Sequence, residues 1–127
     1  MNTQAASVKH PARLGIQQRV LPPYRAPFFD ALAEKFASVS VFAGQVQAGE
    51  AIGGPGGLER AGWVPGRNLY VGRMPNCLIW QRGLTAWLRD FSPQVLIVEA
   101  NLRTLTALTA LRWMHSRRRP VIGWGLG

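Results

Sequence analysis

A short, uninterrupted apolar run at residues 95–98, Val-Leu-Ile-Val, constrains the fold more than any other part of this 127-residue sequence. A strand with one face in water alternates apolar and polar residues, whereas a run that is apolar at every position is typical of a strand covered on both faces. Such strands belong mainly to parallel sheets, whose helical connections cover both sides. The run therefore predicts an α/β domain in which helices flank a central sheet.

Amphipathic helical patterns lie on both sides of this run. Leu84, Trp87, Leu88 and Phe91 recur at the i, i+3, i+4, i+7 spacing of one helix face, and Ser92-Pro93 ends that helix. The same reasoning predicts helices over residues 27–36 and 103–117, and strands over residues 13–21, 39–43, 68–72, 95–98 and 120–124.

This alternation predicts a Rossmann-like, doubly wound, mostly parallel five-stranded sheet in the order 3-2-1-4-5. We expect a flexible leader over residues 1–12 and one domain over 13–127. Residues 44–66 hold eight of the fourteen glycines without helical periodicity and predict an unusually long loop. The third strand then follows an irregular connection or runs antiparallel. The Gly-Gly-Pro-Gly-Gly at 53–57 lacks the Lys-Ser/Thr and the helix of a Walker phosphate loop.

The charge balance is the unusual part of the composition. Thirteen of the fifteen basic residues are arginine, six carboxylates oppose them, and the net charge is +9. This excess indicates an anionic partner, which is nucleic acid, phosphate groups or a membrane surface, or else a solvated basic surface. No apolar stretch is long enough to span a membrane, and the first residues lack the apolar core of a secretory signal. We expect a cytoplasmic protein, with peripheral contact at the inner membrane face as an option.

A ligand site is expected where the carboxyl ends of the strands meet at the switch point of the sheet. Three segments follow strands that this order places next to one another, so their residues should converge in one crevice. The candidate substrate-binding residues are Pro23, Tyr24 and Arg25 after the first strand, Glu99, Asn101 and Arg103 after the fourth, and Gly125 and Gly127 after the fifth.

Each polar candidate also has a structural interpretation. Glu99 would act as a general base or hydroxyl acceptor, or would cap the helix that follows it. Asn101 is favoured as the N-cap of that helix over a ligand group. Arg25 and Arg103 would hold phosphate through paired hydrogen bonds or lie solvated on the surface. The sequence does not identify a catalytic residue.

Other chemically active residue types are too few or too scattered for a site. In the helix over 103–117, the expected apolar face carries Thr104, Ala107, Leu108, Leu111, Met114 and His115. His115 is therefore interpreted as structural, and Cys77 as an inert thiol. No histidine or cysteine has a companion at ligand spacing, so we expect no metal and no cofactor. The tryptophans form no stacking stripe with basic residues, so nucleic-acid binding would rest on charge alone.

Two segments resemble a known enzyme family. The stretch RVLPPYRAPFFDALAEKF (19–36) resembles the opening of the N-terminal domain of bacterial group-one glycosyltransferases of the GT-B type, in which a first strand leads into a Pro-Tyr-Arg-x-Pro-Phe-Phe turn and a helix. The stretch PQVLIVEANLRTLTALTALRWMHSRRRPVIGWGLG (93–127) resembles a later strand, helix and strand of that domain. Together they cover a little under half of the chain, at its two ends.

The resemblance implies the N-terminal Rossmann-like part of a two-domain enzyme. Such enzymes transfer a sugar from a nucleotide-sugar donor to a glycan or lipid-linked acceptor. The N-terminal half mainly binds the acceptor, and the C-terminal half holds the donor. The resemblance therefore implies that this chain is a partial enzyme that needs a donor-binding domain for catalysis.

Two positions depart from the family pattern, and one alternative function remains open. Pro22-Pro23 replaces a glycine pair that many members place near the donor diphosphate, and Leu126 replaces a histidine in the Gly-Trp-Gly-His-Gly end of the last strand. The alternative is a stand-alone basic module that binds nucleic acid or an anionic membrane surface, with nucleic acid the less favoured ligand.

Overall fold

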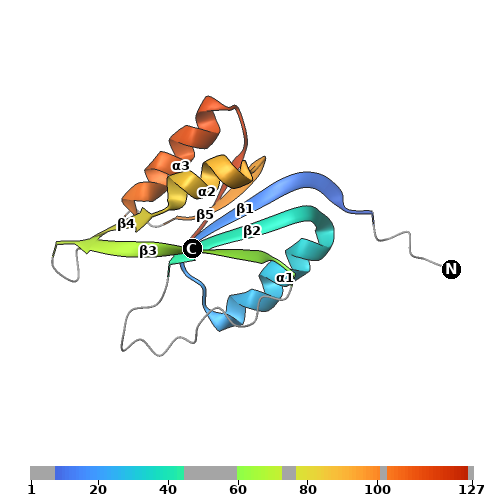
Figure 1. Ribbon diagram of the computed structural model, residues 1–127, viewed down its shortest axis with the longest axis horizontal. Coiled ribbons are helices and arrows are strands. Elements are labelled where there is room, and N and C mark those ends of the chain that lie inside the picture. The colour runs from blue at the N-terminus through green and yellow to red at the C-terminus, as the bar shows by residue number, and fades with distance from the viewer. Residues whose placement is uncertain (1–7, 45–59, 73–76, 101–102, 126–127) are drawn as a thin grey trace.

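The computed structural model describes residues 8–44, 60–72, 77–100 and 103–125, and these form an α/β domain. Figure 1 shows a central sheet with α1 on one face and α2 and α3 on the other. The elements, in chain order, are β1 (His10–Val20), the 3-10 turn η2 (Pro23–Arg25), α1 (Ala26–Lys35), β2 (Phe36–Gly44), β3 (Gly62–Val71), β4 (Leu78–Arg82), α2 (Leu84–Phe91), β5 (Val95–Glu99), α3 (Leu105–Ser116) and β6 (Val121–Trp124).

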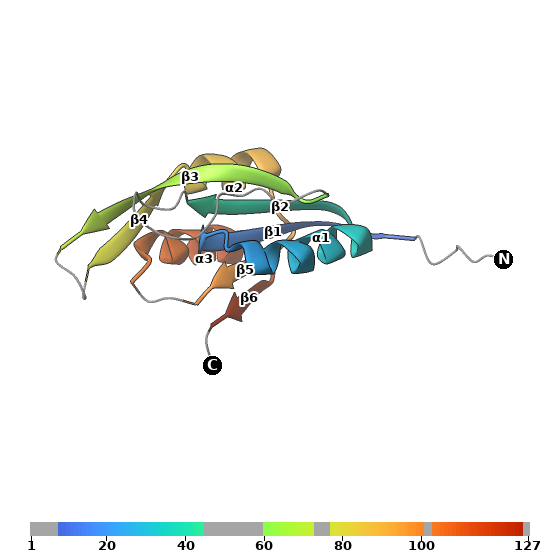
Figure 2. The same ribbon diagram turned by 90° about the horizontal axis from the view of Figure 1, so that it is seen from below.

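The sheet has six strands in the order β4-β3-β2-β1-β5-β6 and curls into a half-barrel (Figure 2). All neighbouring pairs are parallel except β3 with β4, which is antiparallel. The expected plain five-stranded parallel sheet in the order 3-2-1-4-5 is therefore wrong in strand number, in the direction of one edge strand and in shape. With β4 set aside, the other strands run β3-β2-β1-β5-β6. β3 is parallel to β2, so the antiparallel option for that strand is wrong.

Strand β4 was not predicted from the sequence, because its pattern of burial does not follow the polarity of its side chains. Its buried positions hold Ile79 and Gln81, whereas Leu78 and Trp80 are exposed. A strand is usually recognised by apolar residues on one face, and here a glutamine lies inside while two large apolar side chains lie outside. β3 was also expected over 68–72 but begins at Gly62, because its first half pairs with β2.

Two apolar cores lie on opposite faces of the sheet. One lies under α1 and contains Leu14, Ile16, Phe29, Val39 and Val41 among its members. The other lies under α2 and α3 and is built around the following buried residues: Phe42, Leu84, Trp87, Leu88, Leu96, Val98, Ala110 and Met114. The alternate residues of β5 point into the two cores, which confirms that the apolar run at 95–98 is covered on both faces.

The buried face of α3 differs from the expected one. Its buried residues are Thr106, Ala107, Ala110 and Met114, whereas Leu108, Leu111 and His115 are exposed. The helix is therefore rotated relative to the face that its leucines suggested. Small side chains bring this helix close to the sheet, and Thr106 uses its hydroxyl to accept a hydrogen bond from the β4 backbone at Gln81 (3.0 Å).

We predict that Gly66→Ala destabilises the protein. A methyl group on Gly66 would overlap the Phe42 ring, which is fully buried and packs against Trp87. Overpacking of this kind lowers the free energy of unfolding by about 1–3 kcal/mol. The matched control is Gly62→Ala in the same strand, whose methyl would meet only the Val39 carbonyl at an ordinary 3.7 Å. Urea unfolding of both variants is the measurement, and equal losses would contradict the prediction.

Candidate functional site

Arg25 follows the carboxyl end of the central strand β1 and is the last residue of the turn η2. The turn closes with a hydrogen bond from the Arg25 N–H to the Pro22 carbonyl (3.0 Å). The Arg25 guanidinium lies 3.6 Å from a Glu99 carboxylate oxygen and donates a hydrogen bond to the side-chain oxygen of Gln18. The side chains of Arg25 and Glu99 are only 16% and 23% exposed, so solvent screens this ion pair less than a surface pair.

Aromatic rings surround the same guanidinium. Its central carbon lies 4.7 Å from the Trp124 ring centroid and 5.5 Å from that of Tyr24, both within the range of cation–π attraction. Trp124 is itself fixed by the rings of Phe28 and Phe29, whose centroids lie 5.5 and 5.9 Å away. Arg25 is therefore held in one orientation by an anion, an amide and aromatic faces.

The three loops expected to converge do meet around Arg25. Glu99 ends β5 and Trp124 ends β6, and the two pair directly in the sheet. The Ala100 N–H donates to the Trp124 carbonyl (2.8 Å), and Gly125 lies beside Ala100. We name Tyr24, Arg25, Glu99 and Trp124 the Arg25 cluster. Trp124 was not among the expected site residues, although it ends a predicted strand and could have been included for that reason.

The other expected residues are not members of the Arg25 cluster, and two of them lie outside the described residues. Pro23 is exposed in η2 beside Tyr24. The Arg103 carbonyl accepts a hydrogen bond from the Ile79 N–H of β4 (2.7 Å). The N-cap of α3 is Thr104, so Glu99 does not occupy that position. Asn101 and Gly127 themselves lie outside the described residues.

The chemistry of the Arg25 cluster suits the binding of a ligand. The Glu99 carboxylate lies 3.6 Å from the Arg25 guanidinium, and its oxygens can accept hydrogen bonds from a ligand. Tyr24 is 76% exposed and presents a flat ring to solvent next to this ion pair. A fixed cation, a carboxylate and an open aromatic face together suit a polar ligand that carries hydroxyl or phosphate groups.

A buried network of amides lies behind the Arg25 cluster and was missed by the sequence analysis. Gln17, Gln18 and Gln81 are at most 1% exposed. The Gln81 amide nitrogen donates to the Gln18 carbonyl (2.9 Å) and to the side-chain oxygen of Asn68 (3.0 Å), and its oxygen accepts from the Gln17 side chain. The Gln17 oxygen in turn accepts from the Glu99 backbone N–H (3.1 Å). The adjacent Gln17 and Gln18 within a predicted strand could have indicated this network.

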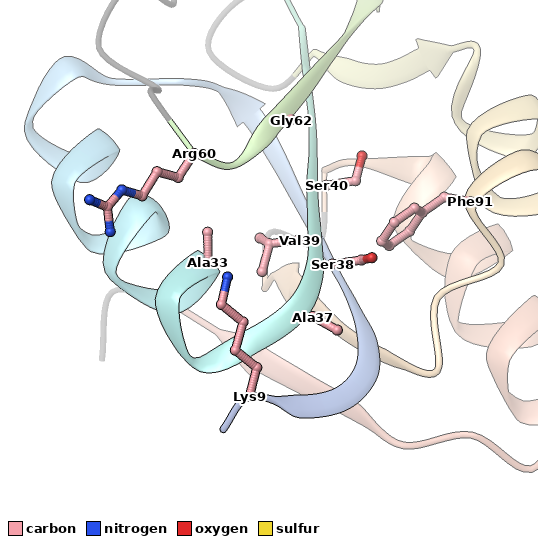
Figure 3. A pocket seen from close by; sticks show the side chains of 9 residues that line it. All are labelled: Lys9, Ala33, Ala37, Ser38, Val39, Ser40, Arg60, Gly62 and Phe91. Carbon is pink, nitrogen blue, oxygen red and sulfur yellow. The ribbon is translucent and has the colours of Figure 1, made fainter. Parts of the chain in front are cut away.

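A shallow pocket of about 660 Å³ lies at the opposite edge of the sheet, near the amino ends of β2 and β3 (Figure 3). Lys9 and Arg60 border it on the α1 side, and Ser38, Ser40 and Phe91 border it on the other. Arg60 already pairs with Glu34, and the Ser40 hydroxyl already accepts from the Trp87 indole (2.8 Å). We assign the site to the Arg25 cluster, because this cluster lies at the carboxyl ends of the parallel strands, whereas Arg60 and Ser40 of the pocket already make structural contacts.

The C-terminal end of α3 carries much of the positive charge. Arg112, Arg117 and Arg118 are exposed there. Arg117 lies over the Trp113 ring at 3.9 Å and donates to the Trp113 carbonyl (3.2 Å), while Arg119 donates to the Ser92 hydroxyl and the Pro93 carbonyl. Part of this charge therefore stabilises the helix end and its junction with α2.

Comparisons with known proteins identify no relative: no family model, no curated protein and no solved structure matches this chain. The glycosyltransferase resemblance therefore stays a prediction. Across the ranges that the structure describes, no three histidine, cysteine, aspartate or glutamate side chains gather as metal ligands. None of the helices described is both long enough and apolar enough to cross a bilayer.

We predict that Gln81→Leu strongly destabilises the protein. The change leaves the Gln17 and Asn68 side chains and the Gln18 carbonyl without their shared partner, and each buried unsatisfied group costs about 1–3 kcal/mol. We expect the free energy of unfolding to fall by about 3 kcal/mol or more. Gln94→Leu is the control, because its hydrogen bond to the Arg13 N–H is solvent-exposed. Similar unfolding midpoints in urea for both variants would contradict the prediction.

Proposed function

We propose that the chain is the acceptor-binding part of a glycosyltransferase, which transfers a sugar from a nucleotide-sugar donor to a glycan or lipid-linked acceptor. The observation that supports this most directly is the Arg25 cluster, which joins the ends of β1, β5 and β6 at the edge where α/β proteins bind ligands. Arg25 and Glu99 both belong to the segments that resemble the GT-B family. The same proposal includes that the curled, six-stranded sheet belongs to a Rossmann-like fold.

Each member of the Arg25 cluster has a role in this function. The Glu99 carboxylate accepts hydrogen bonds from sugar hydroxyl groups, and the exposed Tyr24 ring packs against the apolar face of a sugar. Arg25 holds a phosphate of a lipid-linked acceptor, because its planar guanidinium matches phosphate oxygens. Binding orients the acceptor hydroxyl toward a donor that a second domain would hold.

The loop after β1 supports acceptor binding over donor binding. Pro22 and Pro23 occupy the positions of a glycine pair that would approach a donor diphosphate through backbone N–H groups. Proline has no backbone N–H, so this part of the loop cannot donate hydrogen bonds to phosphate oxygens. The donor would therefore depend on groups outside this loop.

We predict that saccharides linked to a phosphate bind at the Arg25 cluster. Arg25→Gln should weaken this binding by about tenfold to a hundredfold, since a charge-assisted hydrogen bond contributes about 1.5–3 kcal/mol. Backbone NMR shifts during titration with a polyprenyl-phosphate-sugar headgroup analogue give both the site and the Kd. Arg89→Gln on the exposed side of α2 is the control with the same charge change. Glu99→Gln tests the hydroxyl contact separately, because it keeps Arg25.

Shifts confined to residues around Lys9, Ser38 and Arg60 would assign the ligand to the opposite pocket and overturn the proposal. Equal losses in Arg25→Gln and Arg89→Gln would show that only net charge matters. That result would favour the alternative, a stand-alone basic module.

A further inference from the structure

The β3–β4 hairpin extends beyond the rest of the sheet, on the left in Figures 1 and 2. β2 pairs with β3 only from Gly62 to Gly66, so the rest of β3 pairs with β4 alone. The antiparallel register places Arg67 opposite Arg82, Leu69 opposite Trp80, and Val71 opposite Leu78. Since alternate residues of a strand share a face, all six side chains project from one face of the hairpin.

This face is apolar over most of its length, and its apolar residues are exposed. Leu69, Val71, Leu78 and Trp80 are 36%, 57%, 39% and 42% exposed, although residues of these types are usually buried. Scattered single apolar residues on a surface need no explanation, but two adjacent cross-strand pairs form a continuous patch. We name these four residues the hairpin patch.

The two arginines next to the hairpin patch point to an anionic partner. Like charges directly opposite each other on neighbouring strands destabilise a sheet. Among the residues that the structure describes, neither Arg67 nor Arg82 forms an ion pair, and both are exposed. An anion that binds both guanidinium groups would remove this repulsion.

The order of residues along the hairpin matches the layers of a membrane surface. The aliphatic pair of Val71 and Leu78 is farthest from β2, Leu69 and Trp80 come next, and the arginine pair lies nearest the sheet. Successive pairs are about 7 Å apart along the strands, so the three pairs cover about 14 Å, enough to reach from the roughly 5–10 Å depth of an interfacial anchor to the level of the phosphates. Tryptophan prefers the headgroup level of a bilayer, and arginine binds lipid phosphates.

We propose that the hairpin patch and its two arginines form a docking surface for an anionic lipid membrane. The aliphatic pair enters the acyl boundary, Trp80 lies among the headgroups, and Arg67 and Arg82 bind lipid phosphates. The net charge of +9 draws the chain to such a surface from a distance. A second copy of the chain fits the surface less well, because it carries the same charge and four side chains cannot supply the roughly 800 Å² per partner of a stable dimer. This proposal does not depend on the proposed function.

Co-flotation of the full chain with vesicles tests the proposal. We expect binding to vesicles that contain phosphatidylglycerol, weaker binding at high salt, and no binding to pure phosphatidylcholine. Val71→Ser/Leu78→Ser lowers the partition coefficient by roughly tenfold or more. Arg67→Gln/Arg82→Gln lowers it by roughly fivefold for each charge removed.

Matched variants on α3 separate the hairpin from the rest of the surface. Leu108→Ser/Leu111→Ser changes two leucines that are 53% and 38% exposed and should leave partition unchanged. Arg112→Gln/Arg118→Gln removes the same charge as the hairpin arginine variant, and we expect a smaller loss of binding. Far-UV circular dichroism melts check that every variant remains folded. If the α3 variants lose binding as strongly as the hairpin variants, the proposal is wrong.

Tryptophan fluorescence gives an independent measurement of depth. Lipids brominated near the headgroup should quench part of the wild-type emission, and Trp80→Phe should lose that quenched part while it keeps its binding to the vesicles. Quenching that persists in Trp80→Phe would overturn the proposal. Hairpin variants that bind vesicles as strongly as the wild type would also overturn it. So would a wild-type chain that does not bind anionic vesicles but binds RNA or self-associates through the hairpin.

Discussion

The side chain of Gln81 is the contact on which the arrangement of the sheet most depends. It joins the edge strand β4 to the backbone of the central strand β1 in the protein interior and to the half-buried Asn68 on β3. Gln17 extends the network to the backbone of Glu99 on β5. Because a buried amide without partners is costly, these bonds select one register for four strands at once. They also fix the Glu99 backbone, and with it the carboxylate that holds Arg25.

This network also determines which side of β4 faces water. Side chains alternate along a strand, so a register that buries Gln81 must turn Leu78 and Trp80 outward. A shift by one residue would bury the two apolar side chains, but it would expose the glutamine and break its hydrogen bonds. The exposed apolar surface of the hairpin is therefore the direct consequence of a polar interior.

The sequence was sufficient to predict the parts of the fold in which burial follows polarity. The apolar run at 95–98 and the helical spacing from Leu84 to Phe91 led to the α/β class and to two covered faces. The same rule failed for β4 and for α3, because a glutamine and a threonine occupy buried positions there while Trp80 and Leu108 are exposed. Hydrogen bonds between residues far apart in the chain reverse the local pattern at these places, and no window of sequence contains both partners.

The candidate site, like the fold, could be predicted from the sequence only in part. The positions of Arg25 and Glu99 followed from one general rule, which places loops after parallel strands at a common edge. Arg103 follows β5 in the chain as well, but its backbone instead completes the outer edge of β4, a strand whose existence the sequence did not reveal. The backbone of one expected ligand residue thus also supports an edge strand. Trp124 lies at the end of a recognised strand, and its ring became part of the Arg25 cluster because Phe28 and Phe29 hold it there.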